Sequence, residues 1–365
     1  MSKNQIIEFI SKNKNKNNKY IDLYNNKFIK TLLLLIKNII DTNKHILQEL
    51  NYIINNVTKN EELKELFYDN NFVSDDILKE LKTNNINHIV IDNDEFYLSL
   101  YYYNIDNIDE YLKNIIIIIK FIKNINLNFN YKDTKFNVII FLGNSKKYIS
   151  DKIIKPINMN SGSSIPTVYA NLWRKEEYEK VLIHELLHFI KADFFSHDAP
   201  SLEKKIKTII SYDTTNSINE SYNETLAGII NMCYKSIKYD ININKIYEIE
   251  LNFLYIQTAK LIDIFDGSSI KDLFDKKITI RQTTSALSYI IFKMILFHHI
   301  SKTIEFIEKI NFKCNTQNKI DLFGDFLLDC INNETYYDIT DYYIRKLKII
   351  EDDNYIKKNL RMSLI

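Results

Sequence analysis

The chain has 365 residues, and its 48 basic and 47 acidic side chains leave a net charge of +1. That balance excludes the strong positive field by which nucleic-acid-binding and membrane-surface proteins attract their partners. A composition of 45% hydrophobic and 26% charged residues is typical of a globular protein and excludes a disordered one. Only five glycines and three prolines are present, which predicts few tight turns and a largely helical chain.

The cysteines indicate a reducing compartment. Cys233, Cys314 and Cys330 are odd in number and lack C-x-x-C spacing, which argues against a disulfide framework and a cysteine zinc knuckle. The first 20 residues lack the apolar core of a signal peptide. The apolar runs fall short of the ~18–20 residues that span a bilayer. We therefore expect a soluble, cytoplasmic protein without a membrane span.

The N-terminal part of the chain divides into two segments. Residues 1–19 form a polar segment with a low-complexity stretch at residues 11–19, which predicts a mobile surface segment. Residues 20–85 carry apolar clusters at helical spacing and predict a helical N-terminal region.

After residue 86 the apolar period changes to two. Residues 88–92 and 95–103 alternate on either side of Asn93-Asp94 and predict a β-hairpin. A helix and then a strand are predicted next, at residues 107–124 and 135–142.

The next predicted elements are a turn and a strand. The small residues at 161–164 predict the turn, and residues 165–173 predict the strand. Pro166 near the start of this strand is compatible with an edge position rather than a central one, because proline cannot donate a ladder hydrogen bond.

An apolar helix follows, predicted from about residue 174 to 195, and it contains the sequence KVLIHELLHFI at residues 180–190. Almost all of the remaining chain has helical periodicity. The sequence therefore predicts an α+β, mainly helical fold. Its small mixed sheet has an edge strand packed on the HELLH helix, and a helical C-terminal lobe spans residues 237–365.

HELLH matches the metal-binding pattern HExxH. His184 and His188 are four residues apart, so on a helix they share one face and both imidazoles can reach one metal ion. Glu185 is turned by about 100° from His184. Its carboxylate is then placed beside the metal, where it can take a proton from a water molecule. Zinc suits such a site because three protein ligands leave a fourth position open.

The third ligand is predicted on the helix that begins SINESYNETLAGIIN. If Glu220 binds the metal, Glu224, one turn later, can accept a hydrogen bond from a ligand histidine and fix its tautomer. If Glu224 binds the metal, Ser217 and Glu220 form a capping box that starts the helix. We favour Glu220 by the hydrogen-bonding argument and keep Glu224 as the alternate ligand.

HELLH followed by a helix that carries Asn219, Glu220 and Glu224 resembles the gluzincin metallopeptidases, the thermolysin-like group. In that group the third zinc ligand is a helical glutamate, often preceded by asparagine and followed four residues later by an acidic residue. The metzincin pattern does not fit, because Lys191 and Phe194 stand where glycine and histidine are required. The resemblance covers residues 86–236, which we expect to be the catalytic core.

This resemblance implies further site residues. A gluzincin uses a downstream His, Tyr or Arg to stabilise the oxyanion, for which the candidates here are His298, His299, Tyr343 and Arg345. It also pairs extended substrate with the strand before the motif helix, which would be Val168, Tyr169, Ala170 and Asn171. The AT-rich codon usage that the composition implies, together with this motif, also resembles proteins of large DNA viruses. In that case the protein would act in the host cytoplasm or in the virion.

We therefore expect a zinc metallopeptidase with one Zn²⁺ per chain, a peptide or protein substrate, and Glu185 as general base. Two alternatives stay open. The first is a catalytically inactive structural or interaction protein that keeps the fold, and the second is a zinc hydrolase that acts on something other than peptides.

Overall fold

A computed structural model describes residues 3–13, 21–50, 52–57, 67, 71–127, 134–149, 151–194, 198–213, 216–350 and 355–364. The chain forms two compact units. Unit 1 consists of residues 1–30, 147–159 and 192–365, and unit 2 consists of residues 31–146 and 160–191. These units differ from the predicted segments, because residues 86–236 contribute to both of them.

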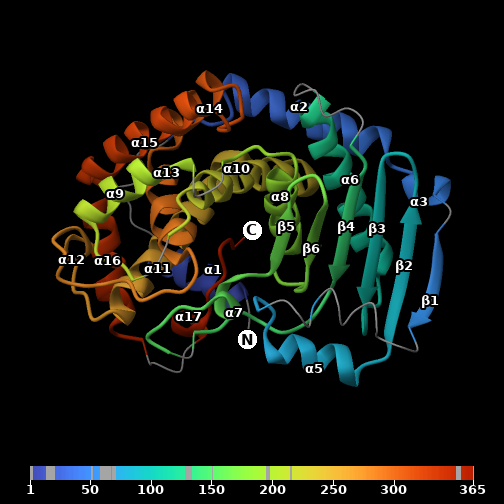
Figure 1. Ribbon diagram of the computed structural model, residues 1–365, viewed down its shortest axis with the longest axis horizontal. Helices are drawn as coiled ribbons and strands as arrows, with labels where there is room; N and C mark the ends of the chain where they lie inside the picture. The colour runs from blue at the N-terminus through green and yellow to red at the C-terminus, as the bar shows by residue number, and fades with distance from the viewer. Residues whose placement is uncertain are drawn as a thin grey trace. The chain divides into compact units, whose positions relative to one another are not determined.

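Unit 2 is built on a mixed sheet with the strand order β1-β2-β3-β4-β6-β5 (Figure 1). Neighbouring strands are antiparallel except for two parallel pairs, β3 with β4 and β4 with β6. The strands are β1 (Ile53–Val57), β2 (Ile86–Asp92), β3 (Phe96–Tyr102), β4 (Phe136–Phe141), β5 (Gly162–Ile165) and β6 (Tyr169–Leu172).

The predicted hairpin is confirmed as β2 and β3. The side chain of Asn93 closes its turn by accepting hydrogen bonds from the backbone N–H groups of Glu95 and Phe96, each at 2.9 Å. Asparagine is favoured in such turns because its short side chain mimics a backbone carbonyl. The predicted strand that became β4 is confirmed as well.

The predicted edge strand is wrong. Strand β6 pairs with β4 on one side and with β5 on the other, so Tyr169, Ala170 and Asn171 lie inside the sheet. Val168 belongs to the turn, and its N–H donates to the carbonyl of Ile165. The edge is β5, which falls where small residues had predicted a turn. Such residues are turn formers in isolation, but here their backbone groups pair with β6.

Both faces of the central strands are buried. Phe136, Val138 and Ile140 point to one face of β4, where the ring of Phe136 lies 4.9 Å from that of Phe189. Ile139 and Phe141 point to the other face and join a separate apolar cluster. Strands that are buried on both sides read as continuous apolar runs, which is why residues 135–142 predicted a strand so clearly.

Two described helices of unit 2 pack together. Helices α6 and α8 pack against each other, and Asn114 donates a hydrogen bond to the Tyr178 hydroxyl at 3.1 Å. α8 also lies against β5 and β6. The helices that lie wholly or mostly in this unit are α2 (Lys27–Thr42), α3 (Ile46–Glu49), α5 (Asp75–Thr83), α6 (Ile108–Leu127) and α8 (Tyr178–Phe189).

All named secondary-structure elements in the described residues of unit 1 are helices. The long helix α11 contacts α10, α13 and α16 and forms the centre of this unit. The described helices of unit 1 are α1 (Lys3–Lys12), α7 (Pro156–Met159), α9 (Pro200–Ile209), α10 (Asn219–Tyr239), α11 (Ile243–Ile264), α12 (Lys271–Phe274), the π-helix η3 (Leu287–Phe292), α13 (Lys293–His298), α14 (Ile300–Lys309), α15 (Gln317–Asn332), the 3₁₀ turn η4 (Glu334–Tyr336), α16 (Tyr337–Leu347) and α17 (Tyr355–Lys358).

The predicted α+β, mainly helical fold is therefore confirmed. One N-terminal prediction needs correction in part, because residues 3–12 form helix α1. Residues 14–19 of the predicted polar segment lie outside the described residues. Ile6 and Ile10 are buried at 1% and 5% exposure, and their spacing of four residues gives α1 an apolar stripe. None of the helices in the described part of the chain is long and apolar enough to cross a membrane.

We expect Leu100→Ala to lower the free energy of unfolding by about 2–5 kcal/mol, because Leu100 is fully buried in β3 and its truncation leaves a cavity. Urea denaturation followed by circular dichroism measures the change. The same substitution at Leu34, which is 61% exposed on α2, is the control and should change stability by less than about 0.5 kcal/mol. Equal effects at the two positions would contradict the packing described for β3.

Candidate metal centre

Helix α8 holds two histidines within a buried environment. Every residue from Tyr178 to Phe189 is buried except His188, which is half-buried. The Nε2 atoms of His184 and His188 lie 3.0 Å apart, and the two rings meet edge to face at 82°. Two nitrogens bound to one tetrahedral zinc at 2.0–2.1 Å would be about 3.3 Å apart, so the rings are already close to a ligating arrangement.

Glu185 lies against strand β5. Its side chain is 5% exposed, and a Cβ atom built on Gly162 would come within 2.6 Å of its Oε1 atom. The same Cβ would lie 2.9 Å from the carbonyl oxygen of Asn171. A larger residue at position 162 would therefore displace the carboxylate, so the glycine leaves the space that Glu185 occupies.

Glu220 lies in the first turn of α10. The helix begins at Asn219 and has no side-chain cap, so the capping box of Ser217 and Glu220, which was part of the alternative with Glu224 as ligand, does not form. The side chain of Asn219 donates a hydrogen bond to Asp193 at 2.8 Å. The acidic side chain of Glu220 is also favoured at this position by the dipole of α10.

Glu224 lies one turn later and has a different environment. It is 1% exposed, and its Oε2 atom lies 3.2 Å from the ammonium group of Lys293, which is 0% exposed. Glu250 approaches the same ammonium group at 4.0 Å. A buried lysine of this kind neutralises its acidic neighbours, and Glu224 is therefore part of a buried ion-pair cluster with Lys293 and Glu250.

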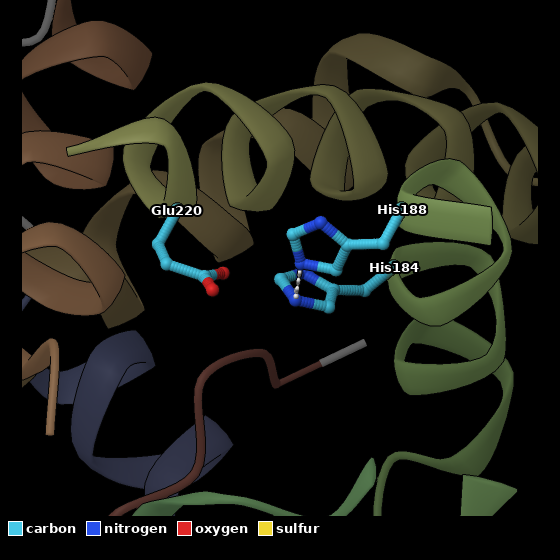
Figure 2. A group of neighbouring side chains, drawn as sticks. All are labelled: His184, His188 and Glu220. Carbon is cyan, nitrogen blue, oxygen red and sulfur yellow. Dashed lines mark hydrogen bonds between the residues drawn. The ribbon is translucent and has the colours of Figure 1, made fainter. Parts of the chain in front are cut away.

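Three of the predicted ligands are close together. His184, His188 and Glu220 each offer one ligand atom, and these atoms all lie within 4.8 Å of one another. Figure 2 shows the two imidazoles extending from α8 and the Glu220 carboxylate extending from α10. Glu224, the predicted alternate ligand, is not a member of this group.

The predicted oxyanion residues all lie in unit 1, on elements that follow α10 in the sequence. His298 bonds to the hydroxyls of Tyr255 and Thr335. The buried hydroxyl of Tyr343 donates to Asn252 at 2.7 Å. His299 lines a small cavity, and Arg345 is exposed on α16. Their role in stabilising an oxyanion stays a prediction.

The cysteines offer no ligand to this group. Cys233, Cys314 and Cys330 are buried and free. Burial raises the pKa of the Cys330 thiol to about 12, and it raises the pKa of the other two thiols as well. Metals bind the thiolate, the form of cysteine that burial disfavours.

Two residues that matter here were not identified from the sequence. Gly162 is one of only five glycines, and that scarcity was the available signal for a close approach of backbone and side chain. Lys293 interrupts a long apolar helical stretch, which was a signal for a buried charge in need of a partner. Neither signal indicates which residue is the partner.

Comparisons with family models, with curated proteins and with solved structures find no match to this chain. The resemblance to gluzincins therefore depends on the motif residues in the sequence and stays an expectation.

We expect Lys293→Met to lower the free energy of unfolding by about 3–5 kcal/mol, because it leaves buried carboxylates at Glu224 and Glu250 without their cation. Urea denaturation measures the loss. Lys152→Met is the matched control, since Lys152 is 62% exposed and pairs with an exposed Asp266. It should leave stability nearly unchanged, and a comparable loss in both variants would contradict the buried ion pair.

Proposed function

We propose that the protein is a zinc-dependent peptidase of the kind that the motif resemblance implies. The observation that carries this proposal is the group formed by His184, His188 and Glu220, with Glu185 next to the first histidine on α8. Two imidazoles and one carboxylate are the ligand set of catalytic zinc sites that keep a position open for water or substrate. A set of cysteine ligands would instead favour a closed structural site.

The residues present fit zinc on chemical grounds. Imidazole nitrogen and carboxylate oxygen are both ligands that zinc accepts in a tetrahedral site, and the 3.0 Å separation of the two Nε2 atoms suits a shared ion. Zinc would supply Lewis acidity to the substrate carbonyl and lower the pKa of water at the site.

Glu185 supplies the proton transfers in this proposal. Its carboxylate takes a proton from the attacking water and later gives it to the leaving amine, as a general base and then a general acid. The carboxylate lies so close to Gly162 that any side chain at that position would meet it. Its placement matters because proton transfer needs a heavy-atom distance of about 2.6–3.2 Å.

Strand β5 would bind the peptide. It is the last strand of the sheet on the side of α8, and Gly162 within it lies against Glu185. An extended peptide that adds to the edge of β5 would pass beside the general base. This edge replaces Val168–Asn171 as the proposed substrate strand, because β6 already has a partner on both sides.

We expect the purified chain to bind one equivalent of zinc and to cleave members of a peptide library, as measured by elemental analysis and mass spectrometry. Glu185→Gln should keep the zinc and lose cleavage by about 10²–10⁴-fold, since general acid–base catalysis contributes about that much.

A Glu185→Gln variant that cleaves at the rate of the parent chain would contradict this mechanism. Zinc binding with no cleavage by the parent chain would instead favour an interaction protein that keeps the metal. Cleavage that persists after all zinc has been removed would exclude a metallopeptidase altogether.

The two glutamates of α10 give a second test. Glu220→Gln should weaken zinc binding by more than about 100-fold, because residues that only support a ligand typically contribute 10–100-fold. Glu224→Gln is the matched control on the same helix and should change zinc affinity by a smaller factor while it lowers stability, since its carboxylate pairs with Lys293. Competition with a chelator measures affinity, and the reverse order of effects would make Glu224 the ligand.

A further inference from the structure

The first turn of α10 carries Glu220 but has no side-chain cap of its own. A helix end of this kind leaves backbone N–H groups without intrahelical partners and tends to fray. Here the turn is buried instead, since Asn219, Ser221 and Tyr222 are 6%, 0% and 2% exposed. The contacts that hold these residues therefore decide where the Glu220 carboxylate can lie.

One side of this turn is held by Tyr222. Its hydroxyl donates a hydrogen bond to the carbonyl of Phe312 at 2.7 Å, and its ring centroid lies 5.4 Å from that of Phe323. The ring of Phe194 meets the same Phe323 ring, with the centroids 6.1 Å apart. Residues three apart lie on the same side of a helix, so Asn219 shares this side of α10 with Tyr222.

Asp193 binds the first residue of the helix directly. Its carboxylate accepts a hydrogen bond from the side-chain amide of Asn219 at 2.8 Å, and the two residues are 8% and 6% exposed. A charged acceptor makes such a bond stronger than one between neutral groups. Loss of the acceptor would leave a buried amide donor without this bond, which costs more than the bond itself contributes. The pair therefore favours one position of the first turn over its alternatives.

The segment that carries Asp193 is itself fixed by packing and by its backbone. Ala192 and Phe194 are 0% and 3% exposed, and the carbonyl of Ala192 accepts a hydrogen bond from the N–H of Cys314 at 2.8 Å. The Asp193 carboxylate also lies near the Cys314 thiol, because its charge adds to the rise in the pKa of that thiol that burial mainly causes. Asp193 therefore holds Asn219 from a fixed position.

We propose that Asp193 is a positioning residue for the candidate metal centre: it holds the first turn of α10 through Asn219 and thereby keeps the Glu220 carboxylate in place as a ligand. The consequence for the metal rests on the proposed function above, whereas the order of the helix end does not. Asp193 is not a member of the ligand group itself. It follows His188 by five residues, so one short stretch of chain contains a candidate ligand and the residue that positions another.

Zinc affinity tests the role of the hydrogen bond. Asp193→Ala should weaken zinc binding by about 10–100-fold, which is the usual effect of removing a residue that supports a metal ligand. Asp193→Asn is the matched variant, because its side-chain carbonyl can still accept from Asn219 although the charge is gone. It should bind zinc nearly as the parent chain does, as measured by competition with a chelator. An Asp193→Asn variant as weak as Asp193→Ala would assign the effect to charge and overturn the proposal.

A double-mutant cycle tests the route through Asn219. Asn219→Ala removes the donor, and its combination with Asp193→Ala should weaken zinc binding no more than either substitution alone, because both act through one hydrogen bond. Losses that add, or a folded Asn219→Ala variant with unchanged zinc affinity, would exclude this route. Alanine is a strong helix former, so Asn219→Ala decides the question where Asp193→Ala does not fold.

Hydrogen exchange in the absence of metal tests the same contact independently of the proposed function. The amides of Glu220 and Ser221 donate to the carbonyls of Ser217 and Ile218 and so report on the first turn. In Asp193→Ala they should exchange about 10-fold faster, because the helix end opens more often, while the central amides of α10 keep their rates.

Thr303→Val is the control for this measurement. It removes another buried hydrogen bond of unit 1, from the Thr303 hydroxyl to the carbonyl of Leu296, and should leave the first-turn amides of α10 unchanged. Equal acceleration of the first-turn and central amides in Asp193→Ala would show that Asp193 only stabilises the unit as a whole, contrary to the proposal.

The two measurements distinguish failure of this inference from failure of the proposed function. A parent chain that binds zinc, with the same affinity in Asp193→Ala, would overturn the positioning role and leave the metal site intact. A parent chain that binds no zinc would overturn the proposed function and the metal consequence with it, and the exchange rates would still decide whether Asp193 holds the helix end.

Discussion

The candidate site depends on the burial of helix α8. All of its residues but one are buried, and Phe189 at its end packs against Phe136 of β4. A helix enclosed in this way cannot rotate about its axis without exposing apolar side chains to water, at about 25 cal/mol per Å². Apolar packing therefore fixes the face of α8 that carries its two histidines and Glu185.

Buried charge organises unit 1 in a comparable way. Lys293 lies among Glu224, Glu250 and a backbone carbonyl, and all of these side chains are almost fully buried. Such a cluster adds little net stability compared with apolar packing, because desolvation offsets the attraction. It does exclude alternative arrangements of α10, α11 and α13, since any of them would leave a charge buried alone.

Local patterns predicted the elements whose burial follows a simple period. The hairpin around Asn93 and the strand β4 were found because their side chains alternate or are apolar throughout. Strand β5 was missed because Gly162, Ser163 and Ser164 carry no such pattern, and only pairing with β6 makes them a strand.

The sequence by itself determined the spacing of the candidate metal ligands. Residues four apart share a helix face, so HELLH places two imidazoles together wherever that helix lies, and NESYNE offers two glutamates on one face. Which of those glutamates lies near the histidines depends on tertiary structure. Glu224 is paired with Lys293, which is 69 positions away, whereas Glu220 is grouped with the histidines. Helical periodicity is a local property of the backbone, but the partner of a buried carboxylate is decided by which distant side chain packs against it.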